Sequence, residues 1–329
     1  MNSMEKTIFT NRWYGLKPSK FVKNIPKRVE FLGKDVVVWR NKENSIVIQD
    51  DLCPHRGARL SMGQVDKKKS CITCPYHGWK FDDEGVLREL PAETNSTLVN
   101  NYKIRTYEAM ESGGIVWACM GKPNGYNPPV IKEMHSRNWI SVTGSAIFEN
   151  DWHTTLENAI DISHVNFVHS DFGDADNGHV DIDSMSEQSP AHLILKSTIR
   201  HKSESPLLKI TENPNVKVTH DVLLPNTVSI KFWVRNIMKV ITYVTYTPLS
   251  DNRTLLNWVF LRSPRFPLID WILNPLFVDG MEKAIKEDKL IVESIINPPN
   301  RINTTPDKIQ MKFRNQLEKL KLSEPTVKY

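Results

Sequence analysis

The chain has 329 residues, of which 40% are hydrophobic and 25% charged, values typical of a globular protein large enough for two domains. Its net charge of +5 is spread along the sequence without a concentrated basic block, which argues against nucleic-acid binding. No run approaches the roughly 18 apolar residues of a membrane span, and residues 1–6 lack a secretion signal, so we expect a cytoplasmic protein.

The first part of the chain has the pattern of a small all-β domain. Residues 29–40 read as two strands around a Gly33-Lys34 turn, and further short apolar runs separated by turns follow. Residues 122–129 are rich in Gly, Pro and Asn, a composition typical of a linker. We therefore predict one domain over residues 1–126, including the N-terminal segment, and a second over residues 127–329.

Two short motifs in the first domain carry metal-binding side chains: Cys-Pro-His at residues 53–55 and Cys-Pro-Tyr-His at residues 74–77. Each brings one thiolate and one imidazole, unlike a zinc finger, in which cysteines pair with cysteines. The set suits a [2Fe–2S] cluster in which two cysteines hold one iron and two histidines hold the other. A Cys2His2 zinc site is the alternative. The predicted cluster ligands are Cys53, His55, Cys74 and His77.

The second domain combines helices with a sheet. Residues 151–169 have helical spacing, and five strand-like runs between residues 191 and 263 indicate an antiparallel sheet. Residues 279–296 and 307–322 read as two helices. The apolar, proline-interrupted segment 266–277 is expected to be buried core or a subunit contact, with a lid or a peripheral membrane contact as alternatives. The predicted fold class is α+β.

A second ligand pattern, Asn-x-x-Asp-x-x-His-x-x-x-x-His, spans residues 158–169. His164 and His169 offer two imidazoles, and Asp161 lies about one helical turn before them. Two histidines and a carboxylate are the ligands of many non-haem iron sites. Because five residues exceed one helical turn, we expect the helix to widen or end between the two histidines.

Together these patterns resemble the motifs of Rieske non-haem iron oxygenases. Residues 53–57 (CPHRG) and 74–79 (CPYHGW) look like the family's two cluster-binding loops, and residues 158–169 look like its iron-binding helix. The resemblance implies that His164 and His169 share a mononuclear Fe(II) with an aspartate from a downstream helix. Placement favours Asp288 for this third ligand, and its competitors are Glu282, Glu287 and Glu293.

The same resemblance implies how the subunits cooperate. In the family, the aspartate that matches Asp161 bridges an iron histidine of one subunit and a cluster histidine of the next. Asp161 is therefore expected to accept hydrogen bonds from His164 and from His77 of the partner subunit. A closed ring of subunits follows, and a homotrimer is the expected state.

The implied function is that of a terminal oxygenase component. Electrons from NAD(P)H are expected to arrive through a flavin reductase, with or without a ferredoxin, because the chain has no Gly-rich nucleotide-binding loop. The size resembles that of stand-alone oxygenases such as vanillate- and dicamba-type demethylases, carbazole oxygenase and saxitoxin-tailoring hydroxylases. Hydroxylation or oxidative demethylation of a small organic molecule with O2 is the leading prediction. Dioxygenation, desaturation, and a Rieske electron carrier without catalysis remain the alternatives.

Overall fold

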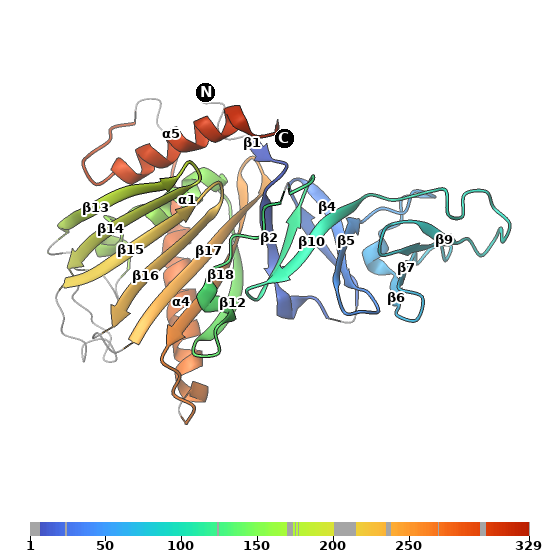
Figure 1. Cartoon of the computed structure of the whole chain (residues 1–329), viewed down its shortest axis with the longest axis horizontal. Helices are drawn as coiled ribbons and strands as arrows, with labels where there is room; N and C mark the ends of the chain where they lie inside the picture. Colours follow the sequence, from blue (N-terminus) through green and yellow to red (C-terminus); the bar gives the residue numbers. More distant parts are fainter. Residues whose placement is uncertain are drawn as a thin grey trace. The chain divides into compact units, whose positions relative to one another are not determined.

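The computed structural model describes residues 7–23, 25–123, 125–169, 174, 176, 178–200, 215–234, 238–268, 270–296 and 301–328. They form two compact units (Figure 1). The smaller unit consists of Thr10–Pro128 with Thr247–Ser250, and the larger unit of Met1–Phe9, Pro129–Tyr246 and Asp251–Lys328. Strand β1 (Thr7–Phe9) is grouped with the larger unit because it pairs with β19 (Thr326–Lys328), a pairing that the predicted limits of 1–126 and 127–329 did not include.

The smaller unit is built from two antiparallel sheets. One has six strands in the order β2-β11-β10-β5-β4-β3, and the other four strands in the order β6-β7-β8-β9. Two 3-10 turns, η2 (Ser19–Phe21) and η3 (Leu60–Met62), complete the unit. The strands are β2 (Trp13–Pro18), β3 (Lys27–Phe31), β4 (Lys34–Arg40), β5 (Ile46–Asp50), β6 (Gln64–Asp66), β7 (Cys71–Thr73), β8 (Lys80–Asp82), β9 (Leu87–Glu89), β10 (Thr106–Ser112) and β11 (Ile115–Cys119).

The turn between β3 and β4 differs by one residue from the prediction. It is formed by Leu32 and Gly33, with φ values of +48° and +75°, and Lys34 already belongs to β4. Two-residue hairpin turns with positive φ at both positions match the right-handed twist of the strands, and this match outweighs the cost of a leucine in that conformation.

The larger unit contains a seven-stranded antiparallel sheet in the order β12-β18-β17-β16-β15-β14-β13. The two edge strands, β12 and β13, were not predicted. Edge strands need fewer apolar residues than central strands, and the sequence of β13, VDIDSMSEQS, is largely polar. The strands are β12 (Ile140–Phe148), β13 (Val180–Ser189), β14 (His192–Arg200), β15 (Asn215–Leu223), β16 (Thr227–Val234), β17 (Met238–Ser250) and β18 (Arg253–Ser263).

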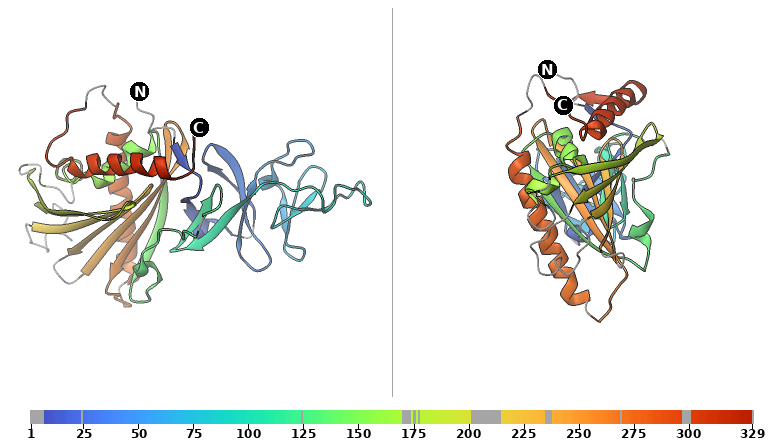
Figure 2. Two further views of the ribbon diagram at one scale, coloured as in Figure 1. Left: turned by 45° about the horizontal axis from the view of Figure 1, so that its top comes forward. Right: turned by 90° about the vertical axis from the view of Figure 1, so that its left-hand side faces the viewer.

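Helices cover one face of this sheet (Figure 2). They are α1 (Trp152–Ile160), α2 (Val165–Val168), α4 (Asp270–Val292) and α5 (Lys308–Ser323), and a 3-10 turn, η4, spans Lys132–His135. Residues of α1, α4 and α5 share one buried core with alternate side chains of the sheet, for example Leu156, Phe313 and Val222. Gly144 in β12 lies opposite Trp258 in β18, and a Cβ atom there would lie 2.2 Å from the indole ring. The glycine thus makes room for the large ring on its neighbour.

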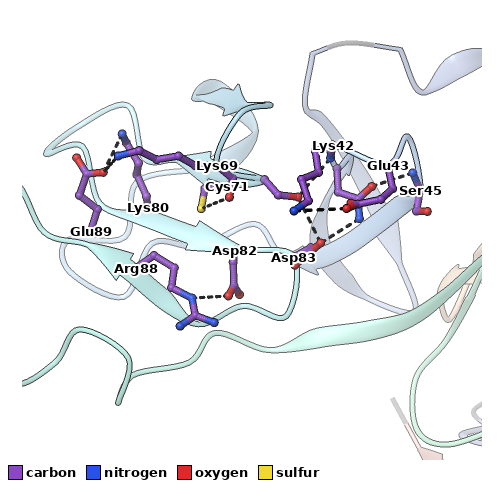
Figure 3. A pocket seen from close by; sticks show the side chains of 12 residues that line it. Lys42, Glu43, Ser45, Lys69, Cys71, Lys80, Asp82, Asp83, Arg88 and Glu89 are labelled. Carbon is purple, nitrogen blue, oxygen red and sulfur yellow. Dashed lines mark hydrogen bonds and ion pairs between the residues drawn. The ribbon is translucent and has the colours of Figure 1, made fainter.

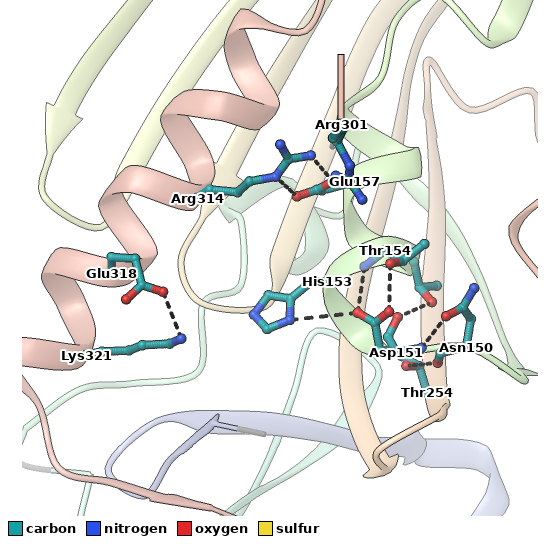
Figure 4. Close-up of polar contacts among 11 residues, drawn as sticks. Asn150, Asp151, His153, Thr154, Glu157, Thr254, Arg301, Arg314, Glu318 and Lys321 are labelled. Carbon is teal, nitrogen blue, oxygen red and sulfur yellow. Dashed lines mark hydrogen bonds and ion pairs between the residues drawn. The ribbon is translucent and has the colours of Figure 1, made fainter. Parts of the chain in front are cut away.

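Helix α1 is anchored at its start and along one side (Figure 4). Asp151 caps its first turn by accepting the Thr154 N–H at 2.9 Å. Glu157 accepts hydrogen bonds from Arg314 of α5 and, at 2.8 Å, from Arg301. These contacts hold the helix that leads into the histidine motif against the C-terminal helix.

Helix α4 begins earlier than predicted, at Asp270 rather than residue 279. Asp270 accepts the Phe266 N–H at 3.0 Å and pairs with the buried Arg262, which also donates to Asn274 at 2.9 Å. This network supports the first turn of α4, and Pro275 follows inside the helix.

The apolar segment 266–277 was expected to be buried core or a subunit contact, and the structure does not show it as buried core. Leu268 and Trp271 are 89% and 74% exposed in the isolated chain, whereas Phe277 packs inward, on Phe260. A subunit contact for this segment stays a prediction. Within the described part of the chain, no helix combines the length and the apolarity needed to cross a membrane.

Candidate metal centres

The two predicted cluster-binding motifs fold into matching loops of the smaller unit. In each loop, the glycine four residues after the cysteine donates its N–H to the cysteine carbonyl: Gly57 to Cys53 at 2.9 Å and Gly78 to Cys74 at 3.2 Å. Both glycines have positive φ values, +74° and +73°. A side chain would strain that conformation, so the glycines are what lets each loop turn back on its cysteine.

The side chains of these loops are divided between core and surface. Cys53 and Cys74 are each 2% exposed and lie in the core of the smaller unit. His55 and His77 lie nearer the surface, with ring centroids 4.4 Å apart, and the His55 ring stacks on Trp79 at 4.8 Å. The cysteines therefore form the inner end of the site and the histidines its outer end.

The donor atoms fit a metal cluster. Burial raises the pKa of Cys53 to about 11, so the charge of a bound metal is needed to hold such a thiol as thiolate. The buried Nδ1 of His55 has no hydrogen-bond partner among the described residues and is open to a metal. Two thiols and two imidazoles are the ligand set of a Rieske [2Fe–2S] cluster, in which each pair holds one iron.

The second motif is shaped by a break at Asp161. This residue has extended backbone angles (φ −76°, ψ 116°), and its carboxylate accepts the Ser163 N–H at 2.8 Å, a bond that competes with helical pairing. Helix α1 ends there, and His164 and His169 flank the one-turn helix α2 as its N-cap and C-cap. The helix thus ends between the two histidines, as predicted, and an additional break at Asp161 precedes both of them.

Helix α4 brings Asp288 to these two histidines. Asp288 Oδ1 lies 3.3 Å from His164 Nε2 and 3.3 Å from His169 Nε2, and the two Nε2 atoms are also 3.3 Å apart. A first-row metal ion about 2.1 Å from each of these atoms would make ligand–metal–ligand angles of about 104°, between octahedral and tetrahedral values. Among the described residues, this is the only group of three or more such atoms within 4.8 Å of one another.

The second nitrogen of each imidazole is held by an acceptor. His164 Nδ1 lies 2.7 Å from the carbonyl oxygen of Asp161, and His169 Nδ1 lies 3.0 Å from Glu287 Oε2. Neither acceptor can donate, so both Nδ1 atoms carry hydrogen, and Nε2 is the nitrogen of each ring that faces Asp288 and is left to bind a metal. Asp288 Oδ1 is buried and receives no well-directed hydrogen bond. Three lone-pair-bearing atoms that converge in this way fit a bound cation.

The charges at this site point to the same conclusion. Burial acts to raise the pKa of Asp288, but its interactions with the two imidazoles outweigh burial and hold that pKa well below the usual range. Burial lowers the pKa of His169, yet its interactions with Asp288 and Glu287 raise it overall. The Asp288 carboxylate is therefore ionised, and together with Glu287 it favours positive charge at this site.

The structure differs from the expected contacts of Asp161. His164 donates to the main-chain carbonyl of Asp161 and not to its carboxylate. Within the described chain, the Asp161 carboxylate instead accepts a hydrogen bond from the Ser163 N–H at its Oδ1 atom. The expected bond from His164 to the Asp161 side chain is thus replaced by a main-chain bond, since the turn that ends α1 directs the carbonyl at the imidazole.

Known families match both parts of the chain. The Rieske [2Fe-2S] domain matches residues 12–108, and the vanillate O-demethylase oxygenase C-terminal domain matches residues 148–322, more than half of the chain. The chain belongs to the vanillate O-demethylase type of Rieske oxygenases. Proteins of this type carry a [2Fe–2S] cluster and a mononuclear iron, and the two donor sets described above fit these groups.

Curated relatives of this Rieske oxygenase are similar over part of their length. The phthalate 4,5-dioxygenase oxygenase subunit of Pseudomonas putida is 34% identical over 149 residues, which are 44% of this chain and 33% of that protein. The terminal oxygenase component of carbazole 1,9a-dioxygenase from Metapseudomonas resinovorans is 31% identical over 172 residues, 50% of this chain and 44% of that protein. The matched segments thus span less than half the length of these relatives.

Solved structures resemble the Rieske oxygenase over nearly its whole length. Dicamba monooxygenase bound to dicamba has a TM-score of 0.84 at 18% identity, covering 96% of this chain and 98% of that one. NdmA of Pseudomonas putida CBB5 with caffeine has a TM-score of 0.82 at 20% identity, covering 96% of both chains. At these identities the likeness shows the fold alone.

Sequence reasoning missed the role that the geometry gives to Glu287. It had been considered only as a rival of Asp288 for the metal, yet it bonds the outer nitrogen of His169. Its position next to Asp288 was a usable signal. Consecutive helix residues point about 100° apart, so both can reach neighbouring atoms of one centre.

A surface pocket of about 640 Å³ in the smaller unit is not a metal centre (Figure 3). Its charged side chains pair with one another: Lys69 and Lys80 with Glu89 at 2.7 and 3.1 Å, and Arg88 with Asp82 at 2.6 Å. The four predicted cluster ligands do not line it. Cys71 does, but its buried thiol donates to the Lys69 carbonyl, and all four cysteines of the chain are free thiols.

Proposed function

We propose that this chain is a terminal oxygenase component that uses O2 and electrons from NAD(P)H to hydroxylate or oxidatively demethylate a small organic substrate. Electrons arrive through a flavin reductase, with or without a ferredoxin. The observation that carries the proposal is the convergence of His164, His169 and Asp288 on one point, with both imidazoles already held in the metal-binding tautomer.

The residues of the larger unit divide the work at this centre. Iron, when bound, supplies the redox chemistry that activates O2. His164, His169 and Asp288 provide three donors, which leaves the other coordination positions to external ligands. The carbonyl of Asp161 and the carboxylate of Glu287 keep the two rings from turning away.

In the smaller unit, Cys53, His55, Cys74 and His77 hold the [2Fe–2S] cluster. The outward position of the two histidines supports electron transfer at the surface of this unit. We propose a homotrimer in which the Asp161 carboxylate accepts a hydrogen bond from His77 of the partner subunit. His164 donates to the main-chain carbonyl of Asp161. Asp161 would therefore connect His164 and His77 of the partner subunit, the first through its carbonyl and the second through its carboxylate.

Metal analysis of the holoprotein tests this proposal. We expect about three irons per chain, two in the cluster and one in the mononuclear site. His164→Ala should lower this to about two irons and abolish substrate-dependent consumption of O2 and NADH with a surrogate reductase, while the cluster absorbance is kept. His192→Ala is the matched control, since His192 lies on β14 beside Asp221 and away from the metal ligands. Two irons in the unchanged protein would favour an electron carrier, and zinc in place of iron would exclude both functions.

The type of oxygenation needs a separate measurement. With labelled O2, hydroxylation or demethylation incorporates one oxygen atom into the products, dioxygenation incorporates two, and desaturation none. We expect one labelled atom. Incorporation of two atoms would show that the chain shares the dioxygenase reaction named for its phthalate and carbazole relatives.

A further inference from the structure

Two buried polar side chains on the helix-covered face of the large sheet each have an atom without a hydrogen-bond partner among the described residues. His220 in β15 is 3% exposed and Ser197 in β14 is 0% exposed. Within the described part of the chain, neither His220 Nδ1 nor Ser197 Oγ has a hydrogen-bond partner. Buried polar groups in proteins are nearly always paired with protein, water or a ligand. The two groups therefore call for a partner that the described residues do not supply.

Strand register places these two side chains next to each other. Across the β14–β15 ladder, His220 pairs with Leu195, and Ser197 pairs with Val218. Ser197 and His220 are thus diagonal neighbours on one face, with Cβ atoms roughly 7 Å apart. A single small molecule can reach both groups at that separation.

The inner face of the sheet around His220 lies near the mononuclear metal site. Burial first, and then the charge of His164, lowers the pKa of His220 to about 4, so the two imidazoles are close enough for their charges to interact. Ile162, next to Asp161, belongs to the same buried core as Leu195, the partner of His220. Burial raises the pKa of Tyr246, and the charge of Asp288 raises it further. Tyr246, on the neighbouring part of the sheet, is therefore also close to the metal site.

The described sheet side chains that share the inner face with His220 and Ser197 are uncharged. Ile230 lies opposite His220 on β16. Asp221 and Lys231 alternate to the other face of the sheet, where they pair with each other. Among the described residues of β14 to β17, the remaining side chains that share the inner face are neutral: Leu193, Ile199, Val216, Val218, Val222, Val228, Phe232, Met238, Val240, Thr242, Val244 and Tyr246.

We propose that His220 and Ser197 bind an uncharged hydrogen-bonding group of the substrate, so that this chain takes neutral molecules with an apolar body, such as phenols and ketones. The inference rests on the oxygenase function proposed above. A neutral imidazole and a hydroxyl each offer one donor and one acceptor, which matches a hydroxyl or carbonyl group. A carboxylate would have to be buried on this face of the sheet, where no described residue of β14 to β17 supplies a cation, and such burial is costly.

The compounds named for the relatives fall into two groups by charge. Phthalate and dicamba are carboxylates, whereas carbazole and caffeine are uncharged. The neutral surroundings of His220 place the substrate of this chain with the second group.

Binding of matched probes to the iron-loaded holoprotein tests the inference. We would measure dissociation constants at neutral pH for 4-methoxyphenol against 4-methoxybenzoate and for 2-naphthol against 2-naphthoate. The neutral member of each pair should bind at least about ten times more tightly, since the charged member loses hydration without gaining an ion pair. A tighter carboxylate in either pair, or no binding of either neutral probe at millimolar concentration, would overturn the inference.

Two variants show whether His220 and Ser197 make the contact. His220→Leu should weaken 4-methoxyphenol by roughly 10- to 100-fold and Ser197→Ala by roughly 5- to 10-fold, the range for loss of one buried hydrogen bond. 4-Methylanisole lacks the hydroxyl group and should bind all forms within about threefold. His192→Leu, on the opposite face, is the matched control and should change neither probe.

An equal loss of 4-methylanisole would show that His220 acts only in packing and would refute the contact. The cluster absorbance reports folding, and if His220→Leu fails to fold, Ser197→Ala and the unchanged protein decide the question. Consumption of O2 separates this inference from the proposed function. A neutral preference in binding, without O2 consumption by any compound, refutes the function alone. O2 consumption driven only by carboxylates refutes the inference alone.

Discussion

Replacing Glu287 with alanine removes the carboxylate that accepts the His169 N–H at 3.0 Å. The Glu287 side chain is only 23% exposed, so solvent screens this charge-assisted bond only in part. Without it, the His169 ring is free to turn and to place its proton on Nε2, the nitrogen that faces Asp288. Loss of such a partner behind a metal-bound histidine typically lowers metal affinity by about 10- to 100-fold, which corresponds to about 1.4–2.7 kcal/mol.

The assay is a competition between the protein and a chelator for Fe(II), repeated with Co(II), which avoids oxidation. Glu287→Gln keeps an oxygen that accepts the Nδ1–H but loses the charge, so its affinity should fall between those of the unchanged protein and Glu287→Ala. Glu282→Gln is the matched control, because Glu282 is an exposed acidic residue of the same helix. It should bind metal as the unchanged protein does.

Equal metal affinity of Glu287→Ala and the unchanged protein, within about twofold, would refute the positioning role. The same would follow if Glu282→Gln lost as much affinity as Glu287→Ala, since the effect would then come from net charge near the site. Unchanged cluster absorbance in all variants is the control for folding of the smaller unit.

Three further outcomes are expected. Burial lowers the pKa of His153 to about 3, while the unfolded chain binds that proton near pH ~6.5. This contribution to the free energy of unfolding is therefore complete above pH ~6.5 and is lost as pH falls towards 3. His153→Leu should flatten the pH dependence of stability measured by urea unfolding. An unchanged pH dependence would contradict the assignment. Gly144→Ala should lower the melting temperature because its Cβ would overlap the Trp258 ring, whereas Gly280→Ala, with no atom within 4 Å, should raise it slightly through helix propensity; similar shifts for both would count against this packing argument. Asp161→Asn should retain mononuclear iron, because the main-chain bond to His164 remains, yet slow electron transfer to it in single-turnover measurements; loss of the iron itself would show that the carboxylate has a structural role instead.

Much of the fold followed from sequence patterns. The α+β class with an N-terminal Rieske domain is confirmed by the two family matches. Five strands of the large sheet and the C-terminal helix were recognisable because each buries a regular apolar face. The edge strands β12 and β13 were missed because pairing with a neighbour, more than their own composition, makes them strands. The early start of α4 was missed because the Arg262 network that supports it joins residues of two different elements.

The cluster motifs and the two histidines could be found from the sequence alone, since each pair of donors (Cys53 with His55, Cys74 with His77, His164 with His169) lies within a few consecutive residues. Local turns, such as those at Gly57 and Gly78, depend on residue type and not on distant packing. The assignment of Asp288 and Glu287 to different atoms of one centre could not be found in this way. It depends on how α4 is rotated about its axis against α2, and a rotation of one residue, about 100°, would exchange their roles. That rotation is set by the packing of α4 on the large sheet, so only the tertiary structure decided which carboxylate faces Nε2 of both histidines and which holds Nδ1 of His169.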